Sequence, residues 1–163
     1  TSIRFFSVYG SPQIPKKGSH SWAVAIFGAL AKKGKPITVF GDGNQIRDFT
    51  HVSDIAESVV LSTEKESTNG KFFNVGTGKP ISINKIVKLL KCQSVNIPKR
   101  PGEPDETNAN IGKIKKKLNW RPKISIKNGI NRLLKDINYW NNAPVWTPKT
   151  IKIATKEWFK YLK

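Results

Sequence analysis

Two arginines are the residues of this sequence best suited to holding an anionic ligand. Arg47 follows a glycine-rich turn at the start of a predicted strand, and Arg100 lies in a loop bounded by proline and glycine. Because a guanidinium stays charged and binds phosphate through two parallel hydrogen bonds, two arginines on loops can grip a diphosphate from two sides. Ion pairs are the alternative, of Arg47 with Asp48 or Asp54 and of Arg100 with Glu103. Composition alone favours an ion pair for Arg47.

The other reactive side chains form no complete catalytic or metal site. His20 and His51 are far apart in the sequence and have no second ligand nearby, so no metal site is expected. Cys92 comes at the end of a predicted helix, and the sequence indicates no partner histidine for a nucleophile. The carboxylates of the 103–106 loop lie beside Arg100, which neutralises them. We therefore expect no catalytic residue in this chain.

One glycine-rich segment resembles a phosphate-binding loop. Gly76-Thr-Gly78 follows a predicted strand, but the third glycine of the dinucleotide-binding fingerprint is missing because Lys79, Pro80 and Ile81 come next. The sequence contains no GxxxxGK[ST] motif either. We therefore interpret the segment as a turn that leads into a helix.

Strands alternate with helices in the predicted order of elements, which is typical of an α/β fold. Runs of β-branched and aromatic residues predict strands at 3–8, 37–40, 48–52, 72–75 and 95–97. Apolar spacing and capping residues predict helices at 22–33, after Ser53 or Asp54, after Ser82, after Ser125 and after Thr147-Pro148. The last helix is expected to bury Ile151, Ala154, Trp158 and Leu162.

The chain has 163 residues, a formal charge of +18 and 37% hydrophobic residues, with five tryptophans. This length and apolar content fit a folded domain and not a disordered chain. The longest apolar run, 22–31, is too short to span a membrane, and no N-terminal secretion pattern is present. With a single cysteine, the composition predicts a cytoplasmic protein.

The basic excess suggests nucleic-acid binding, because clustered lysine and arginine neutralise phosphates. Only five of the 29 basic residues are arginine, however, and base-reading surfaces favour arginine. The lysines are spread along the chain, apart from a dense cluster at 113–117 on a predicted short helix. We interpret most of them as solvated surface. A basic nucleic-acid or polyanion-binding module is the secondary hypothesis, and a purely structural domain is a third.

Four segments together carry a family resemblance. They are IRFFSVYG at 3–10, GKPITVFGDGNQIRDFTHVSDI at 34–55, FNVGTG at 73–78, and RPGEPDET at 100–107 leading to LNWRP at 118–122. In this order they resemble the C-terminal half of the extended short-chain dehydrogenase/reductases, in particular NAD-dependent nucleotide-sugar epimerases and dehydratases of the UDP-glucose and UDP-glucuronate 4-epimerase type. The likeness covers residues 1–140.

The resemblance implies an incomplete NAD(P)-binding Rossmann-like fold. Residues 1–10 and 71–91 would belong to the Rossmann layer, and the rest of 1–140 to the small α/β substrate-binding domain. Residues 141–163 form a C-terminal helical tail outside the shared pattern. Because the sequence has no methionine and begins directly on a predicted strand, we expect a piece of a longer protein.

The family's N-terminal half supplies the glycine fingerprint and a catalytic Tyr-x-x-x-Lys pair. Here the residue four positions after Tyr9 is Gln13, and the one after Tyr139 is Ala143, so the pair is absent. The resemblance implies that NAD in the complete enzyme takes a hydride from sugar C4, with the tyrosine as base. We expect no tightly bound NAD and no activity in this chain alone.

The resemblance also assigns residues that bind the ligand. Arg47 and Arg100 match the arginines that hold the nucleotide diphosphate, and Glu103 matches a carboxylate that holds ribose hydroxyls in some members. The remaining assignments are Thr38, Val39 and Phe40 along the nucleobase, Ser7 beside the sugar and Phe5 near the nicotinamide.

The sugar and the reaction stay open on these residues. The hydroxyl of Ser7 favours a uronic acid, but the 10–21 loop lacks the arginine of glucuronate-type members, and Lys16 or Lys17 would supply only a point charge. A UDP-sugar 4-epimerase is the favoured function, with a 4,6-dehydratase or a decarboxylase as alternatives. Uncovered strand edges predict a homo-oligomer, with paired or exchanged strands.

Overall fold

The structure is a computed structural model that describes residues 1–15 and 22–161. Lys16, Lys17, His20 and Leu162, which carried expectations from the sequence, lie outside the described residues. The elements in chain order are β1 (Ser2–Phe5), β2 (Ser7–Tyr9), α1 (Ala23–Lys32), β3 (Ile37–Phe40), β4 (Ile46–Arg47), β5 (Phe49–His51), α2 (Val52–Thr63), η1 (Glu66–Thr68), β6 (Phe72–Val75), β7 (Ile81–Ser82), α3 (Ile83–Leu90), β8 (Ser94–Ile97), α4 (Gly112–Leu118), α5 (Ile126–Lys135), η2 (Ile137–Trp140), α6 (Pro148–Ala154) and α7 (Lys156–Tyr161).

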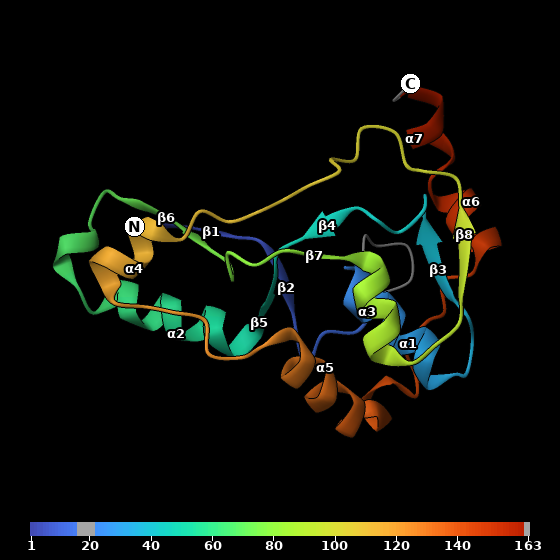
Figure 1. The fold of residues 1–163 in the computed structure, drawn as a ribbon, viewed down its shortest axis with the longest axis horizontal. Coiled ribbons are helices and arrows are strands. Elements are labelled where there is room, and N and C mark those ends of the chain that lie inside the picture. Colours follow the sequence, from blue (N-terminus) through green and yellow to red (C-terminus); the bar gives the residue numbers. More distant parts are fainter. Residues whose placement is uncertain (16–21, 162–163) are drawn as a thin grey trace.

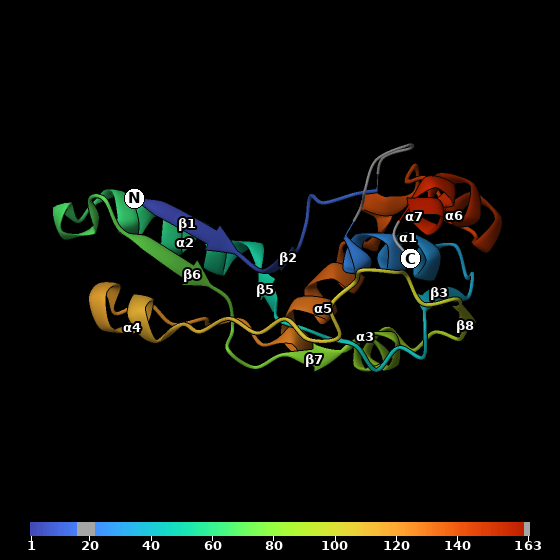
Figure 2. The ribbon, with the colours of Figure 1, turned by 90° about the horizontal axis from the view of Figure 1, so that it is seen from above.

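Two groups of elements lie at opposite ends of an elongated molecule (Figures 1 and 2). β1, β6, α2 and α4 lie at the end that holds the N-terminus. α1, α3, β3, β8, α6 and α7 gather at the other end, and β2, β5 and β7 lie between the two groups. The chain also crosses between the groups in the extended segments before and after α4 (Figure 1).

The predicted strand at 3–8 is divided into two strands that have different partners. β1 pairs in parallel with β6, and β2 pairs in parallel with β5. At the break, the N–H of Phe6 donates to the carbonyl of Val75 at 3.2 Å, and the N–H of Ser7 donates to that of Asp48 at 3.0 Å. The chain therefore passes from one sheet to the next without an intervening loop.

The remaining strands form two further pairs. β3 pairs in parallel with β8, and β4 pairs antiparallel with β7. β3 and β6 have the bounds expected from the sequence, since each is a short apolar run that ends at a glycine. Parallel strands joined by helices give the mixed α/β architecture that the alternation predicted.

Each end of the molecule has its own hydrophobic core. The larger core lies among α1, α3 and α5 and contains fully buried Ile86 and Trp140. The smaller one joins β6 to α2 and α4 through Phe73, Ile114 and Trp120. The indole N–H of Trp120 donates to a backbone carbonyl of α2 at 3.1 Å, so this buried ring also has its polar group satisfied.

Three helices begin where the sequence predicts them. The side-chain oxygens of Ser82, Ser125 and Thr147 each accept a hydrogen bond from the backbone N–H three residues further on, at the start of α3, α5 and α6. These caps satisfy N–H groups that the helix itself leaves unpaired.

The cap expected for α2 at Ser53 or Asp54 is wrong. α2 begins at Val52, and His51 caps it by accepting the N–H of Ser53 at Nδ1, at 3.2 Å. The Asp54 carboxylate is unavailable as a cap because it accepts the backbone N–H groups of residues 123 and 124, both at 3.1 Å.

The tail forms two short helices where one was expected. The hydroxyl of Thr155 donates to the carbonyl of Ile151 at 2.8 Å, and such bonds to the preceding turn bend helices. Ile151 is buried as expected, whereas Ala154 is exposed because the chain turns directly after it. Among the described residues, no helix is long and apolar enough to cross a membrane.

Candidate functional site

One cavity of about 190 Å³ brings together most of the residues expected to bind a ligand. Its walls come from β2, β3, β4, β5, α1, α3, α6 and the loop after β8. The expected residues that line it are Ser7, Thr38, Phe40, Arg47, Arg100 and Glu103. Residues from distant parts of the sequence therefore meet at one place.

Val39 and Phe5 do not line this cavity. Successive side chains of a strand point to opposite faces, so Thr38 and Phe40 face the cavity while Val39 packs in the larger core at 1% exposure. Phe5 lies at the end of β1, with 49% of its surface exposed. Any contact of Val39 with a ligand in this cavity would have to come from its backbone.

Glu103 lies between the two arginines of the cavity. Nη2 of Arg47 donates to Oε1 of Glu103 at 2.9 Å, and Nε of Arg100 is 3.7 Å from Oε2. The expected alternative partners of Arg47 are wrong, because the carboxylates of Asp48 and Asp54 accept backbone N–H groups instead. Two guanidinium groups and one carboxylate leave this wall with a positive charge.

The side chain of Arg100 also lies against two aromatic rings. Its Cζ atom is 4.2 Å from the centre of the Phe40 ring and 4.7 Å from that of the Trp158 ring. Its Nε atom is buried and has no hydrogen-bond partner among the described residues. The indole N–H of Trp158 donates to the carbonyl of Pro101 at 2.8 Å. α7 is thus attached to the loop that carries Arg100.

The Gly76-Thr-Gly78 turn surrounds a carboxylate of the protein itself. Oδ1 of Asp48 accepts the N–H of Thr77 at 2.6 Å and the Thr77 hydroxyl at 2.5 Å. Oδ2 accepts the N–H of Gly78 at 2.8 Å and that of Ala109 at 3.2 Å. Converging backbone N–H groups make an anion site, and here Asp48 occupies it. The segment is therefore a turn, as expected, and not a phosphate loop.

His51 and Cys92 have structural surroundings. Burial, with the positive charge of Arg132, lowers the pKa of His51 against the opposing effect of Asp54. The thiol of Cys92 donates to the carbonyl of Leu90 at 3.3 Å, and burial raises the pKa of this thiol. A cysteine held as the neutral thiol is a poor nucleophile, as expected for an ordinary small residue.

The sequence reasoning missed three contributors to the site. Trp22, at the start of α1, lines the cavity with 60% of its surface exposed, and Ile151 of α6 lines it from the tail. Gln45 also lines it and donates to the carbonyl of Phe40 at 2.9 Å. The sequence showed a tryptophan at the predicted helix start but not its exposure, and no local sequence pattern indicates that Ile151 lies near β3.

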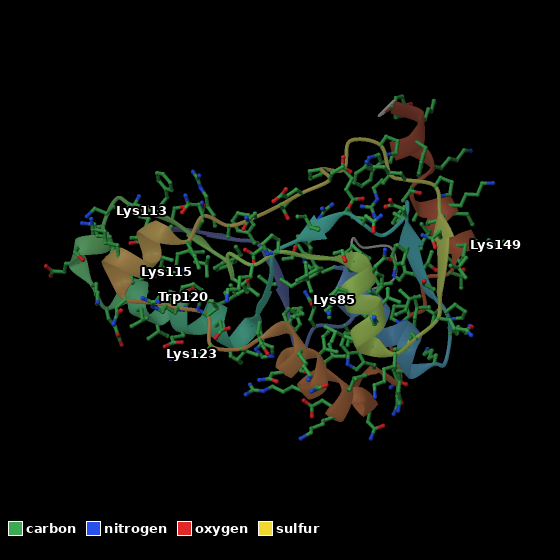
Figure 3. The ribbon with its side chains drawn as sticks, in the orientation of Figure 1. Lys85, Lys113, Lys115, Trp120, Lys123 and Lys149 are labelled. Carbon is green, nitrogen blue, oxygen red and sulfur yellow. The ribbon has the colours of Figure 1, made fainter. Side chains whose placement is uncertain are left out.

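The lysines are distributed over both ends of the molecule (Figure 3). Lys113 and Lys115 extend from α4 at one end, and Lys149 lies on α6 at the other. Nζ of Lys113 lies 3.9 Å from the centre of the Phe72 ring, so this lysine also covers apolar surface. The lysines labelled in Figure 3 are thus spread over both ends and do not gather at one place.

Known proteins resemble the chain along most of its length. Residues 1–76 match the model of the NAD dependent epimerase/dehydratase family. A UDP-glucuronate 4-epimerase of Thermodesulfobacterium geofontis is 35% identical over 160 residues, which cover 93% of this chain and 46% of that protein.

Solved structures show the same relationship. The crystal structure of UDP-glucose 4-epimerase with UDP-glucose from Thermotoga maritima has a TM-score of 0.76 at 32% identity, covering 85% of this chain and 44% of that one. UDP-glucuronic acid 4-epimerase from Bacillus cereus, in complex with UDP-glucuronic acid and NAD, has a TM-score of 0.73 at 30% identity and the same coverages. The chain thus spans less than half the length of these relatives, with an incomplete Rossmann-like fold. In sequence and in fold it is thus similar to members of the NAD dependent epimerase/dehydratase family.

Proposed function

We propose that this chain is the nucleotide-sugar-binding, C-terminal portion of an NAD-dependent nucleotide-sugar 4-epimerase, with a UDP-sugar as its ligand. The observation that carries the proposal is the convergence of Arg47 and Arg100 on one cavity wall, on either side of Glu103. The relatives crystallised with UDP-glucose and UDP-glucuronic acid support the choice of ligand.

In the proposed complex, the diphosphate lies between the two guanidinium groups. Phosphate oxygens compete with the Glu103 carboxylate for the N–H groups of Arg47, and Glu103 turns toward the ribose hydroxyls. The base lies along Thr38 and Phe40, and the sugar reaches toward Ser7. Because a nucleotide sugar exceeds the 190 Å³ of the cavity, the ligand extends beyond its rim.

This chain alone does not fit a dinucleotide cofactor. The Gly76-Thr-Gly78 turn after β6 is filled by the Asp48 carboxylate, and the sequence lacks the Tyr-x-x-x-Lys pair. We propose that NAD is held by other segments of the complete enzyme. The isolated chain then binds UDP but neither binds NAD tightly nor turns a sugar over.

Calorimetric titration of the chain with UDP, UMP and uridine tests this proposal. A clamp on the diphosphate predicts that affinity falls in the order UDP, UMP, uridine. Arg47→Ala should weaken UDP binding about 10- to 100-fold, because a hydrogen bond to a charged group contributes about 1.5–3 kcal/mol. Arg121→Ala, at an exposed arginine away from the cavity walls, is the matched control and should leave the affinity unchanged.

Three outcomes would contradict the proposal. Equal affinities for UDP and uridine would show that the two arginines do not bind the diphosphate. Measurable 4-epimerase turnover by the isolated chain with NAD would contradict the expected inactivity of this chain alone. Duplex DNA binding that falls steeply with salt and is not displaced by a UDP-sugar would favour the polyanion-binding alternative.

A further inference from the structure

The C-terminal tail reaches the candidate binding cavity although its sequence lies outside the motifs that predict the site. Ile151 of α6 lines the cavity wall and is 5% exposed. Trp158 of α7 contacts Arg100 and the residue after it. α7 and the loop after β8 lie at the same end of the molecule (Figure 1).

Arg100 depends on ring contacts for its position. Nε of Arg100 is 3.7 Å from Glu103 Oε2, which is longer than a hydrogen bond, and it is buried without a hydrogen-bond partner among the described residues. Besides this ion pair with Glu103, the guanidinium lies against the rings of Phe40 and Trp158, whose centres are 4.2 and 4.7 Å from Cζ. A ring contacts the face of a guanidinium, whereas phosphate binds the N–H groups at its edge. Ring contacts therefore orient Arg100 and leave its donors for an anion.

Trp158 is itself fixed to the loop that it supports. Its indole N–H donates to the carbonyl of Pro101 at 2.8 Å, directly next to Arg100 in the sequence. At its other side, buried Thr155 joins α7 to α6 through the bond to Ile151. The tail thus connects one wall of the cavity with the arginine on another.

We propose that Trp158 is a positioning residue that holds the guanidinium of Arg100 for binding the diphosphate of a nucleotide ligand. This inference rests on the proposed function and goes beyond it, because it makes the tail part of the binding site. Trp158 acts through Arg100 and makes no contact of its own with the phosphates.

The experiment compares Trp158→Leu, Trp158→Phe and Trp146→Leu in the 163-residue chain. We expect Trp158→Leu to weaken UDP binding about tenfold, since cation–π contacts at partly buried sites have about this effect. Trp158→Phe keeps a ring beside Arg100 and should restore most of the affinity. Trp146→Leu makes the same change before α6 and should leave the affinity unchanged. Combined with Arg100→Ala, Trp158→Leu should change affinity less than about twofold, because its partner is absent.

A spectroscopic measurement follows Arg100 without any ligand. The chain has five arginines, so its ¹⁵N spectrum holds five arginine Nε resonances, and Arg100→Lys identifies the one from Arg100. Ring currents of the two aromatic contacts should displace that resonance from the other four. Trp158→Leu should move it back toward them, and Trp158→Phe and Trp146→Leu should not.

The results separate this inference from the proposed function. If wild-type chain binds UDP and Trp158→Leu binds it equally well, or if Trp146→Leu weakens binding as much, the inference is overturned and the proposed function stands. If the Arg100 resonance is unchanged in Trp158→Leu, the ring contact is overturned whatever the affinity. If wild-type chain binds neither UDP nor a UDP-sugar, the proposed function falls, and the positioning role falls with it.

Discussion

Replacing Asp48 by asparagine tests whether the hydrogen bonds to this buried carboxylate stabilise the fold. Asp48 is fully buried and accepts four hydrogen bonds, from the N–H and hydroxyl of Thr77 and from the N–H groups of Gly78 and Ala109. These bonds join the start of β5 to the turn after β6 and to the loop before α4. Asparagine has nearly the same shape but only one acceptor oxygen.

The expected loss can be worked out from these contacts. With the NH₂ group at the position of Oδ2, the N–H groups of Gly78 and Ala109 lose their acceptor. With the NH₂ group at the position of Oδ1, the Thr77 N–H loses its acceptor, whereas the Thr77 hydroxyl can accept from the NH₂ group. A hydrogen bond to a charged group contributes about 1.5–3 kcal/mol, so the loss should be about 1.5–6 kcal/mol for one or two such bonds. A domain of this size has a free energy of unfolding of about 5–15 kcal/mol, and the variant should therefore lose a substantial part of it.

Urea unfolding followed by tryptophan fluorescence measures this change, with Asp42→Asn as the matched control. Asp42 is exposed and accepts from the backbone N–H and side-chain amide of Asn44, in its own turn. Its replacement should shift the unfolding midpoint far less. If the two variants lose similar stability, the reasoning that assigns Asp48 a central structural role is refuted.

Three further predictions follow from buried and exposed groups. Gly76→Ala should destabilise the chain strongly, because a Cβ at this position would lie 2.3 Å from Cβ of Ala109. Gly112→Ala, at the start of α4, is the control and should not. Equal urea midpoints for the two variants would contradict the crowding at Gly76. The pKa of His51 is lower in the folded chain than in the unfolded chain, so the unfolded chain takes up the imidazole proton first as the pH falls. Stability should therefore fall as the pH drops through about 6.5, the ordinary pKa of histidine, and it should fall less in His51→Gln; parallel pH profiles of the two chains would exclude the histidine as the cause. The exposed β1–β6 pair, where Phe5 is 49% exposed, should drive concentration-dependent association in sedimentation, and a monomer at all concentrations would count against it.

Local pattern predicted the elements whose ends are set by their own residues. β3 and β6 are short β-branched or aromatic runs that end at glycine, and α3 carries both a serine cap and helical apolar spacing. The division of 3–8 at Phe6 was not predictable in this way, because it depends on which distant strand each half meets. The same holds for α2, whose cap moved to His51 because Asp54 is bound elsewhere in the fold.

The residues of the candidate site were predictable only where they belong to a sequence motif of the family. Arg47, Arg100 and Phe40 were expected from the resemblance, and the structure brings them to one cavity. Val39 was expected along the nucleobase with its two neighbours, and the alternation of side chains along a strand points its side chain away from the cavity, so only its backbone can contact a ligand there. Trp158 carries no motif, and its contact with Arg100 exists only because the tail folds back on the loop after β8.

A crystal structure of the chain with UDP would show directly whether Arg47 and Arg100 hold a diphosphate. We expect the diphosphate within hydrogen-bond distance of Arg47 and Arg100, with Glu103 displaced from Arg47 and Trp158 still against Arg100. Diphosphate bound elsewhere, on the lysines of α4 for example, with the Arg47–Glu103 bond intact, would contradict it.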